Sequence, residues 1–300
     1  LQEYGIYDNP RLQAYVDSVG QRLAKVSQLP NLQWHFTVLD DPAVNAFAIP
    51  GGYIYITRGI LSHLNSEAQL AGVLGHEIGH VTARHSAKQM TQQQVAGLGM
   101  AIAGAVSQTF RRYSDAAQQA LGLVFLKYSR DDETQADELG VGYATRAGWD
   151  PREIPATYAT LKRVGDRAGQ RLPSYLSTHP DPGDREVRTT ALAKQAATGK
   201  TGLAIRNKIY LAHVDGIVFG DDPRQGYFVD NHFYHADLRF EMAFPVSWKT
   251  QNSKSAVMAA EPNNRAAMQL TAVNPQGVSP SAFVNQLVSD NKVTGANGAQ

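Results

Sequence analysis

The sequence contains no cysteine among its 300 residues. Disulfides therefore contribute nothing to the stability of the fold, and any metal site must be built from His, Asp or Glu side chains. A chain without cysteine is compatible with any cellular compartment, so this absence does not locate the protein.

The sequence also lacks an excess of charge of either sign. Its 28 basic and 27 acidic residues give a formal net charge of +1 at pH 7, which offers a polyanion no broad electrostatic attraction. We therefore do not expect nucleic acid as a partner. With 43% hydrophobic and 18% charged residues, the composition is typical of a globular protein rather than a disordered or membrane-spanning one.

No hydrophobic run is long enough to cross a membrane as a helix. The most apolar stretch, Val95 to Val106, is shorter than the roughly 20 residues that a span requires. We expect a buried helix there, with a peripheral membrane contact as the alternative. The chain starts at Leu1 without a basic or apolar leader, so we expect that a targeting segment was removed.

Hydrophobic periodicity changes near residue 200. Before it, helical spacing predicts helices over 8–28, 66–81, 86–108, 115–147, 152–166 and 184–196, and alternation predicts strands over 34–39, 44–49 and 53–57. After the linker-like stretch ATGKTG, short β runs precede a helix over 280–289. We expect an α+β protein: a mostly helical domain with a small antiparallel sheet at residues 1–198, and a smaller α+β domain at residues 203–300.

The helix predicted over 66–81 carries His76, Glu77 and His80 in the sequence HEIGH. Residues four apart share a helix face, so both imidazoles can hold one metal ion, with Glu77 beside the first. The alternative is a pair of exposed histidines. It is disfavoured because apolar residues leave this helix little exposed face: Leu70, Val73, Leu74, Ile78 and Val81.

A catalytic zinc ion takes three protein ligands and keeps one position open for water. Glu133 and Asp137 lie four residues apart on the helix predicted over 115–147. We assign Glu133 as the third ligand and Asp137 as the acceptor that fixes the tautomer of a ligating histidine. The alternative is a solvated acidic patch. Small neighbouring residues would let the two helices approach closely: Ala136, Gly140 and Ala144.

Other histidines carry weaker signals. His85 lies nine residues after His76, on the opposite face of a continuous helix, so we predict that it is not a ligand. His232 and His235 fall in the second domain, where surface or capping roles and adventitious metal binding are the expected alternatives.

The motifs resemble those of the gluzincin zinc metallopeptidases of the HtpX and CAAX prenyl protease family, closest to its soluble bacterial periplasmic members. The resemblance covers roughly residues 1–195. Besides HEIGH it includes ETQAD at residues 133–137, NAFA before Pro50, and STHP followed by Arg185. It implies a zincin-type fold, zinc as cofactor and a protein or peptide substrate in the bacterial periplasm or cell envelope.

The resemblance also implies roles for individual residues. Arg185 would stabilise the oxyanion that forms on the scissile carbonyl. His179 would either assist it or bind zinc in the fourth position, displace the water and leave the enzyme self-inhibited; the sequence leaves both open. An extended substrate would pair with an active-site edge strand, whose residues are Asn45, Ala46, Phe47 and Ala48.

The function expected from the sequence is therefore a zinc-dependent endopeptidase that acts on unfolded or misassembled proteins. A zinc-activated water would attack the peptide carbonyl, with Glu77 as general base. The alternatives are an envelope assembly factor or chaperone with little or no proteolysis, which the intact Glu77 disfavours, and an exopeptidase. The second domain weakly resembles PsbP/Mog1-like domains, which suits substrate or partner binding.

Overall fold

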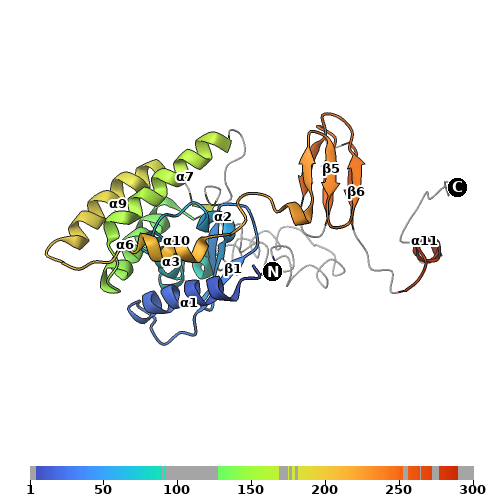
Figure 1. The fold of residues 1–300 in the computed structure, drawn as a ribbon. Coiled ribbons are helices and arrows are strands. Elements are labelled where there is room, and N and C mark those ends of the chain that lie inside the picture. Colours follow the sequence, from blue (N-terminus) through green and yellow to red (C-terminus); the bar gives the residue numbers. More distant parts are fainter. Residues whose placement is uncertain are drawn as a thin grey trace, which may run out of the picture. The chain divides into compact units, whose positions relative to one another are not determined.

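The contacts of the chain divide it into a first unit, residues 1–222, and a second unit, residues 223–300, whose elements are labelled in Figure 1. The computed structural model describes residues 5–89, 91, 128–168, 175, 178–179, 182–252, 256–263, 265–271 and 277–289. Predictions made for other residues lie outside this set; they include the apolar stretch Val95–Val106 with its expected membrane contact. Within it, no helix combines the length and apolarity that a membrane crossing needs.

Helix α1 (Pro10–Lys25) packs beside a three-stranded sheet in the first unit. The strands are β1 (His35–Leu39), β2 (Ala46–Ile49) and β3 (Tyr53–Thr57), in the order β1-β3-β2. β3 is antiparallel to β2 but parallel to β1. The α+β class with a small sheet is thus confirmed. One pair of its strands is antiparallel and the other is parallel, because β3 turns back from β2 and inserts between the two earlier strands.

Helices α3 (Glu67–Thr82) and α6 (Arg130–Arg146) pack closely against each other. A Cβ atom added at Gly140 would lie 2.8 Å from the backbone nitrogen of His76, and one added at Gly79 would lie 3.0 Å from a backbone oxygen of α6. Side chains larger than hydrogen do not fit these contacts without a shift of the backbone. The predicted close approach of the two helices through small residues is confirmed.

Helix α6 begins at Arg130, whereas helical spacing predicted a helix over 115–147. The Ser129 hydroxyl accepts a hydrogen bond from Asp132 N, and the Asp132 carboxylate accepts one from Ser129 N, both at 3.1 Å. This reciprocal capping box ends the helix on its N-terminal side. It also fixes the turn that carries Glu133.

The remaining elements of the first unit surround this helix pair. α7 and α9 lie side by side (Figure 1). The elements are α2 (Arg58–Leu61), η1 (Pro151–Glu153), α7 (Ile154–Ala168), α9 (Pro182–Ala197) and α10 (Asn207–Val214).

The first unit extends to Asp222, about twenty residues past the division expected at 198–203. Helix α10 packs on α1 and α3 through Tyr210, which is fully buried. The buried Arg58 side chain donates hydrogen bonds of 2.8 and 2.6 Å to two backbone carbonyls that follow α10. These contacts hold the chain beyond ATGKTG on the first unit, so that stretch is a surface loop within it.

The second unit contains two antiparallel sheets of three strands each, with orders β4-β5-β6 and β7-β8-β9. Its apolar core comprises Phe233, Phe244, Val257 and Ala259. The elements are η2 (Pro223–Gln225), β4 (Tyr227–Val229), β5 (His232–His235), β6 (Phe240–Ala243), β7 (Lys249–Asn252), β8 (Val257–Ala260), β9 (Ala267–Leu270) and α11 (Pro280–Ser289).

Candidate metal centre

His76 and His80 project from one face of α3 and turn their Nε2 atoms toward each other, 2.9 Å apart. Both side chains are buried, with exposed fractions of 2% and 0%. The imidazole rings meet edge to face, with centroids 4.6 Å apart. The alternative of two solvent-exposed histidines is therefore excluded for this helix.

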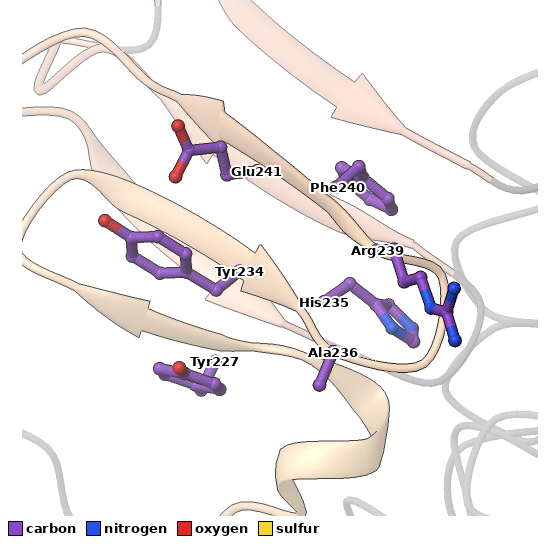
Figure 2. Close-up of a pocket in the computed structure, with 7 residues that line it drawn as sticks. All are labelled: Tyr227, Tyr234, His235, Ala236, Arg239, Phe240 and Glu241. Carbon is purple, nitrogen blue, oxygen red and sulfur yellow. The ribbon is translucent and has the colours of Figure 1, made fainter.

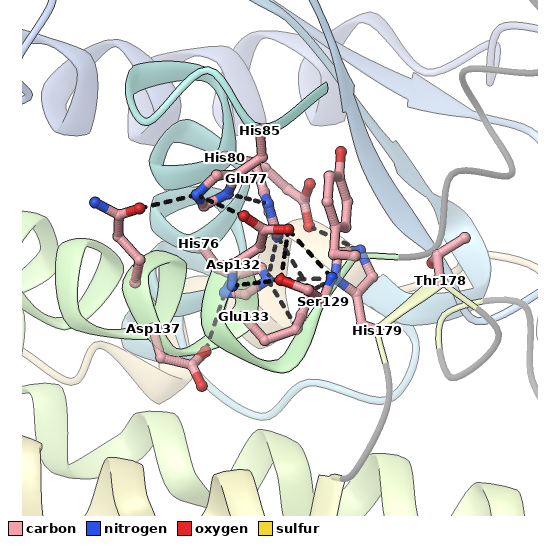
Figure 3. A network of polar contacts seen from close by, with 12 residues as sticks. His76, Glu77, His80, His85, Ser129, Asp132, Glu133, Asp137, Thr178 and His179 are labelled. Atoms are coloured by element: carbon pink, nitrogen blue, oxygen red, sulfur yellow. Dashed lines mark hydrogen bonds and ion pairs between the residues drawn. The ribbon is translucent and has the colours of Figure 1, made fainter. Parts of the chain in front are cut away.

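Glu133 reaches the same point from the first turn of α6, and His179 reaches it from the segment before α9 (Figure 3). Glu133 Oε1 lies 3.4 Å from His80 Nε2 and 2.8 Å from His179 Nδ1. One potential ligand atom from each of the four residues lies within 4.8 Å of all the others, and all four residues are buried. We call His76, His80, Glu133 and His179 the four-residue cluster.

Asp137 lies behind His76, one turn after Glu133 on α6. Its Oδ1 is 3.0 Å from His76 Nδ1, the nitrogen that points away from the cluster. Burial alone would raise the pKa of Asp137, but Arg185 and His76 hold it well below its usual value. The carboxylate is therefore charged at neutral pH and can accept a hydrogen bond from His76 Nδ1, the arrangement that the spacing predicted.

Arg185 lies on α9 and is 1% exposed. Its Nη2 donates to Asp137 Oδ1 at 2.7 Å and to the Tyr158 hydroxyl at 2.9 Å. Its Nη1 forms an ion pair with Glu133 Oε2 at 2.6 Å but donates no hydrogen bond among the described residues. The guanidinium thus bridges the carboxylates of Glu133 and Asp137.

Glu77 is fully buried next to His76, and neither of its carboxylate oxygens has a hydrogen-bond partner among the described residues. The closest ion-pair contact is between Glu77 Oε1 and His179 Nε2, at 3.8 Å. Burial raises the pKa of Glu77 despite the opposing influence of His179 and His76. A carboxylate with a raised pKa and free acceptor atoms is suited to take a proton.

His85 is not one of the four-residue cluster, as predicted, but it does not lie on the far side of the helix. Helix α3 ends at Thr82, and Arg84 takes a left-handed backbone conformation with φ of 60°. The chain therefore turns back, and His85 Nδ1 lies 2.9 Å from His80 Nδ1. Helical periodicity could not find this contact, because the periodicity stops before the residue.

The predicted substrate strand overlaps β2, which is one of the two outer strands of the described sheet. Its predicted residues Asn45 to Ala48 are all buried. Tyr175, which lies four residues before His179, donates a backbone hydrogen bond of 3.1 Å to the carbonyl of Val44. The segment that brings His179 to the cluster is thus also joined to the start of β2.

The donor set fits a zinc ion. Two imidazoles and a carboxylate are the ligands of many catalytic zinc sites. Burial lowers the pKa of His80 well below its usual value, and His76 lowers it further, so the imidazole is in the neutral form that binds metals. Glu77 and His179 Nε2 present buried polar atoms without hydrogen-bond partners among the described residues, which is costly unless another group satisfies them.

The family model for peptidase family M48 matches residues 10–192, more than half of the chain. The chain belongs to peptidase family M48. This membership confirms the resemblance seen in the sequence, the enzyme class of zinc metallopeptidases and zinc as the cofactor. The assignment of individual ligands and catalytic residues stays a prediction, supported by the geometry above.

Curated relatives of this M48 chain include the mitochondrial metalloendopeptidase OMA1 of Arabidopsis thaliana, 34% identical over 190 residues, which are 60% of the chain and 38% of the relative. The beta-barrel assembly-enhancing protease of Escherichia coli is 31% identical over 192 residues, again 60% of the chain and 38% of the relative. OMA1 of Schizosaccharomyces pombe is 33% identical over 171 residues, 57% of the chain and 50% of the relative. The chain thus spans half or less of the length of each.

The second unit of the M48 chain has a pocket of about 340 Å³ on the sheet β4-β5-β6 (Figure 2). Tyr227, Tyr234 and Glu241 pair in register across the three strands and so form one row on one face of the sheet. The two tyrosine rings stack with centroids 5.7 Å apart. His235 and Arg239 contribute to the rim where β5 turns into β6.

Proposed function

We propose that this chain is a zinc-dependent endopeptidase that hydrolyses peptide bonds in unfolded or misassembled proteins. The main support for this proposal is that His76, His80 and Glu133 converge from two closely packed helices. Next to them lies the buried Glu77, whose carboxylate oxygens have no hydrogen-bond partner among the described residues. His76, His80 and Glu133 hold the zinc ion, and Asp137 orients His76 through its Nδ1.

The bound zinc ion supplies a Lewis acid that lowers the pKa of a water molecule toward 7. Glu77 accepts a proton from the attacking water and later returns it to the leaving amine. Arg185, whose Nη1 forms an ion pair with Glu133 Oε2 beside the cluster, supplies positive charge for the oxygen of the carbonyl as it becomes negative. Burial of the whole site strengthens each of these interactions.

His179 is proposed as a fourth ligand in the state described here. Its place in the four-residue cluster, with its Nδ1 2.8 Å from Glu133 Oε1, supports this role over assistance to the oxyanion. With His179 in place the position for the attacking water is filled, and the enzyme is self-inhibited. Since the segment of Tyr175 and His179 is also joined to β2 through Val44, its displacement would free the ion and the start of the strand together.

The substrate would bind in extended form along β2, at residues Asn45 to Ala48. The position of this strand at one edge of the described sheet supports the proposal. Asn45 Oδ1 is buried and has no hydrogen-bond partner among the described residues, so it can accept one from a substrate amide. Recognition through backbone hydrogen bonds tolerates many side chains, which suits substrates selected by being unfolded.

The proposal is tested by a casein cleavage assay on wild type and Glu77→Gln, each with and without a chelator. Loss of the base should lower the rate by about 10²- to 10⁴-fold, while zinc content stays equal because Glu77 is not a ligand. Addition of chelator should abolish the wild-type activity. Equal activity of the two proteins, with equal zinc content, would overturn the mechanism.

An assembly factor or chaperone with little proteolysis is the second candidate. The relative in Escherichia coli is named for enhancing β-barrel assembly, and a filled fourth ligand position would keep proteolysis low. In this case Glu77→Gln should retain the full ability to suppress aggregation of an unfolded protein. Loss of that ability together with proteolysis would instead favour the peptidase.

The bacterial envelope is the proposed location, although the OMA1 relatives are by name mitochondrial. For the second unit we propose binding of substrate or partner polypeptide, supported by the row of Tyr227, Tyr234 and Glu241 that lines its pocket. Replacement of both tyrosines by serine should then weaken binding of unfolded casein without changing the cleavage of a short peptide.

A further inference from the structure

His85 lies directly behind His80, on the side away from the four-residue cluster. His80 turns its Nε2 to the cluster, and its Nδ1 lies 2.9 Å from His85 Nδ1 (Figure 3). His85 is 1% exposed, so no bulk solvent competes for this contact. A neutral imidazole donates through one nitrogen and accepts through the other, so one of the two Nδ1 atoms must donate and the other must accept.

The other side of His85 decides which atom donates. His85 Nε2 lies 3.0 Å from Gln135 Oε1 and 3.4 Å from a carboxylate oxygen of Asp132. Both oxygens are acceptors, so in the neutral ring, which carries one proton, that proton belongs on Nε2 of His85. Its Nδ1 is then a bare acceptor, and His80 Nδ1 must carry a proton. His80 Nε2 is left with a free lone pair, directed at the cluster.

We propose that His85 is a positioning residue that fixes the tautomer and orientation of His80 for metal binding. The inference rests on the proposed role of His80 as a ligand. A chain of contacts runs from Gln135 through His85 to His80, and all its members lie on α3, α6 or the turn after α3. In the proposed site His76 is oriented by a carboxylate, Asp137, whereas His80 is oriented by the imidazole of His85.

Local structure supports this role. The left-handed Arg84 turns the chain so that His85 faces back toward α3. The Tyr128 ring stacks on the ring of His80 with centroids 3.8 Å apart, and its hydroxyl lies 2.9 Å from Ser86 Oγ. The turn after α3 therefore fixes His80 at its outer nitrogen through His85 and across its ring face through Tyr128.

The test compares His85→Leu, His85→Asn and Gln135→Leu with wild type, using a chromogenic chelator to measure the zinc dissociation constant. His85→Leu should weaken zinc binding by about 10- to 100-fold. His85→Asn should recover most of this loss, because the amide oxygen can take the place of Nδ1 as acceptor. Gln135 is exposed, so its variant tests the chain of contacts without disturbing the core, and should weaken binding less. Lys88→Leu, an exposed change in the helical residues that begin at His85, is the matched control and should have no effect.

Nitrogen NMR of the histidines in the metal-free protein measures the tautomer of His80 and so tests the inference independently of zinc binding. Wild-type His80 should be protonated at Nδ1, and His85→Leu should populate both tautomers. Equal zinc affinity of His85→Leu and wild type, or a His80 tautomer unchanged by the substitution, would overturn the inference. If the wild-type protein binds zinc but cleaves no protein, only the proposed function is contradicted. The measured tautomer of His80 would still decide whether His85 has the proposed role.

Discussion

At the scale of single residues, we propose that His179 decides whether the metal centre is open. Its two ring nitrogens lie between Glu133 and Glu77, at 2.8 and 3.8 Å from their carboxylate oxygens. A ring in this place shields the base from a water molecule and from a substrate carbonyl.

We expect His179→Ala to raise the rate of casein cleavage. An increase of about 10-fold corresponds to a plug that is stabilised by roughly 1.4 kcal/mol over the open state. His232→Ala, at an exposed histidine of the second unit, is the control and should leave the rate unchanged. A lower rate with unchanged zinc content would mean that His179 assists the reaction instead.

The convergence of His76, His80 and Glu133 could be predicted from spacing, since i and i+4 positions on α3 and α6 share a face whatever surrounds them. His85 could not. Its position depends on the end of α3 and on the left-handed Arg84, and a non-glycine residue in that conformation has no reliable sequence signal. The contact of Tyr128 with His80 likewise joins residues from separate elements.

At the scale of elements, the contact between α3 and α6 sets the distance between the histidine pair and Glu133. Gly140 is the tightest point, because a Cβ atom there would lie 2.8 Å from the backbone nitrogen of His76. The atoms nearest to this position are backbone atoms of His76 and Gly75, so no flexible side chain could move aside to make room.

Gly140→Ala should therefore destabilise the fold by about 1–3 kcal/mol through overpacking, and should weaken zinc binding because the helices must separate. Gly142→Ala is the matched control on the same helix. Its Cβ would meet only the end of the flexible Arg146 side chain, at 3.3 Å, and the gain in helix propensity should stabilise the protein by up to about 1 kcal/mol. Urea unfolding measures both; equal effects of the two changes would contradict the packing argument.

Element types could largely be predicted from periodicity, but element ends and pairing could not. The helical spacing predicted one helix over 115–147, but α6 begins at Arg130, where Ser129 and Asp132 form a capping box that periodicity does not reveal. The insertion of β3 between β1 and β2 depends on contacts between distant strands, which the alternation within each strand does not encode.

At the scale of the whole molecule, composition placed the division between units too early. The polar stretch ATGKTG resembles a linker, yet the residues after it return to the first unit through Tyr210 and the partners of Arg58. A contact made so far along the chain leaves no local trace in the sequence.

A chain of residues 1–222 should therefore fold and bind zinc, whereas a chain of residues 1–202 should not. Loss of the fully buried Tyr210 side chain alone would leave a cavity in the core, which lowers the free energy of unfolding by about 3–5 kcal/mol. Circular dichroism and zinc titration of the two fragments measure the difference. Equal stability of both would return the boundary to the ATGKTG stretch.

Removal of zinc should lower the melting temperature of the intact protein. A ligand present at 1,000 times its dissociation constant stabilises the native state by about 4 kcal/mol. Calorimetry with and without a chelator measures the shift, and Glu133→Gln, with a weakened site, should show a smaller one. An unchanged melting temperature would mean that the ion does not bind the native fold tightly.

The four-residue cluster draws together parts of the chain that are far apart in sequence: His76 and His179 are separated by 103 positions, and Glu133 and His179 by 46. An ion shared by these residues acts as a cross-link that closes two long loops, in a protein that has no disulfide to do so. Cells short of zinc would then hold a chain that is not only inactive but also easier for other proteases to degrade.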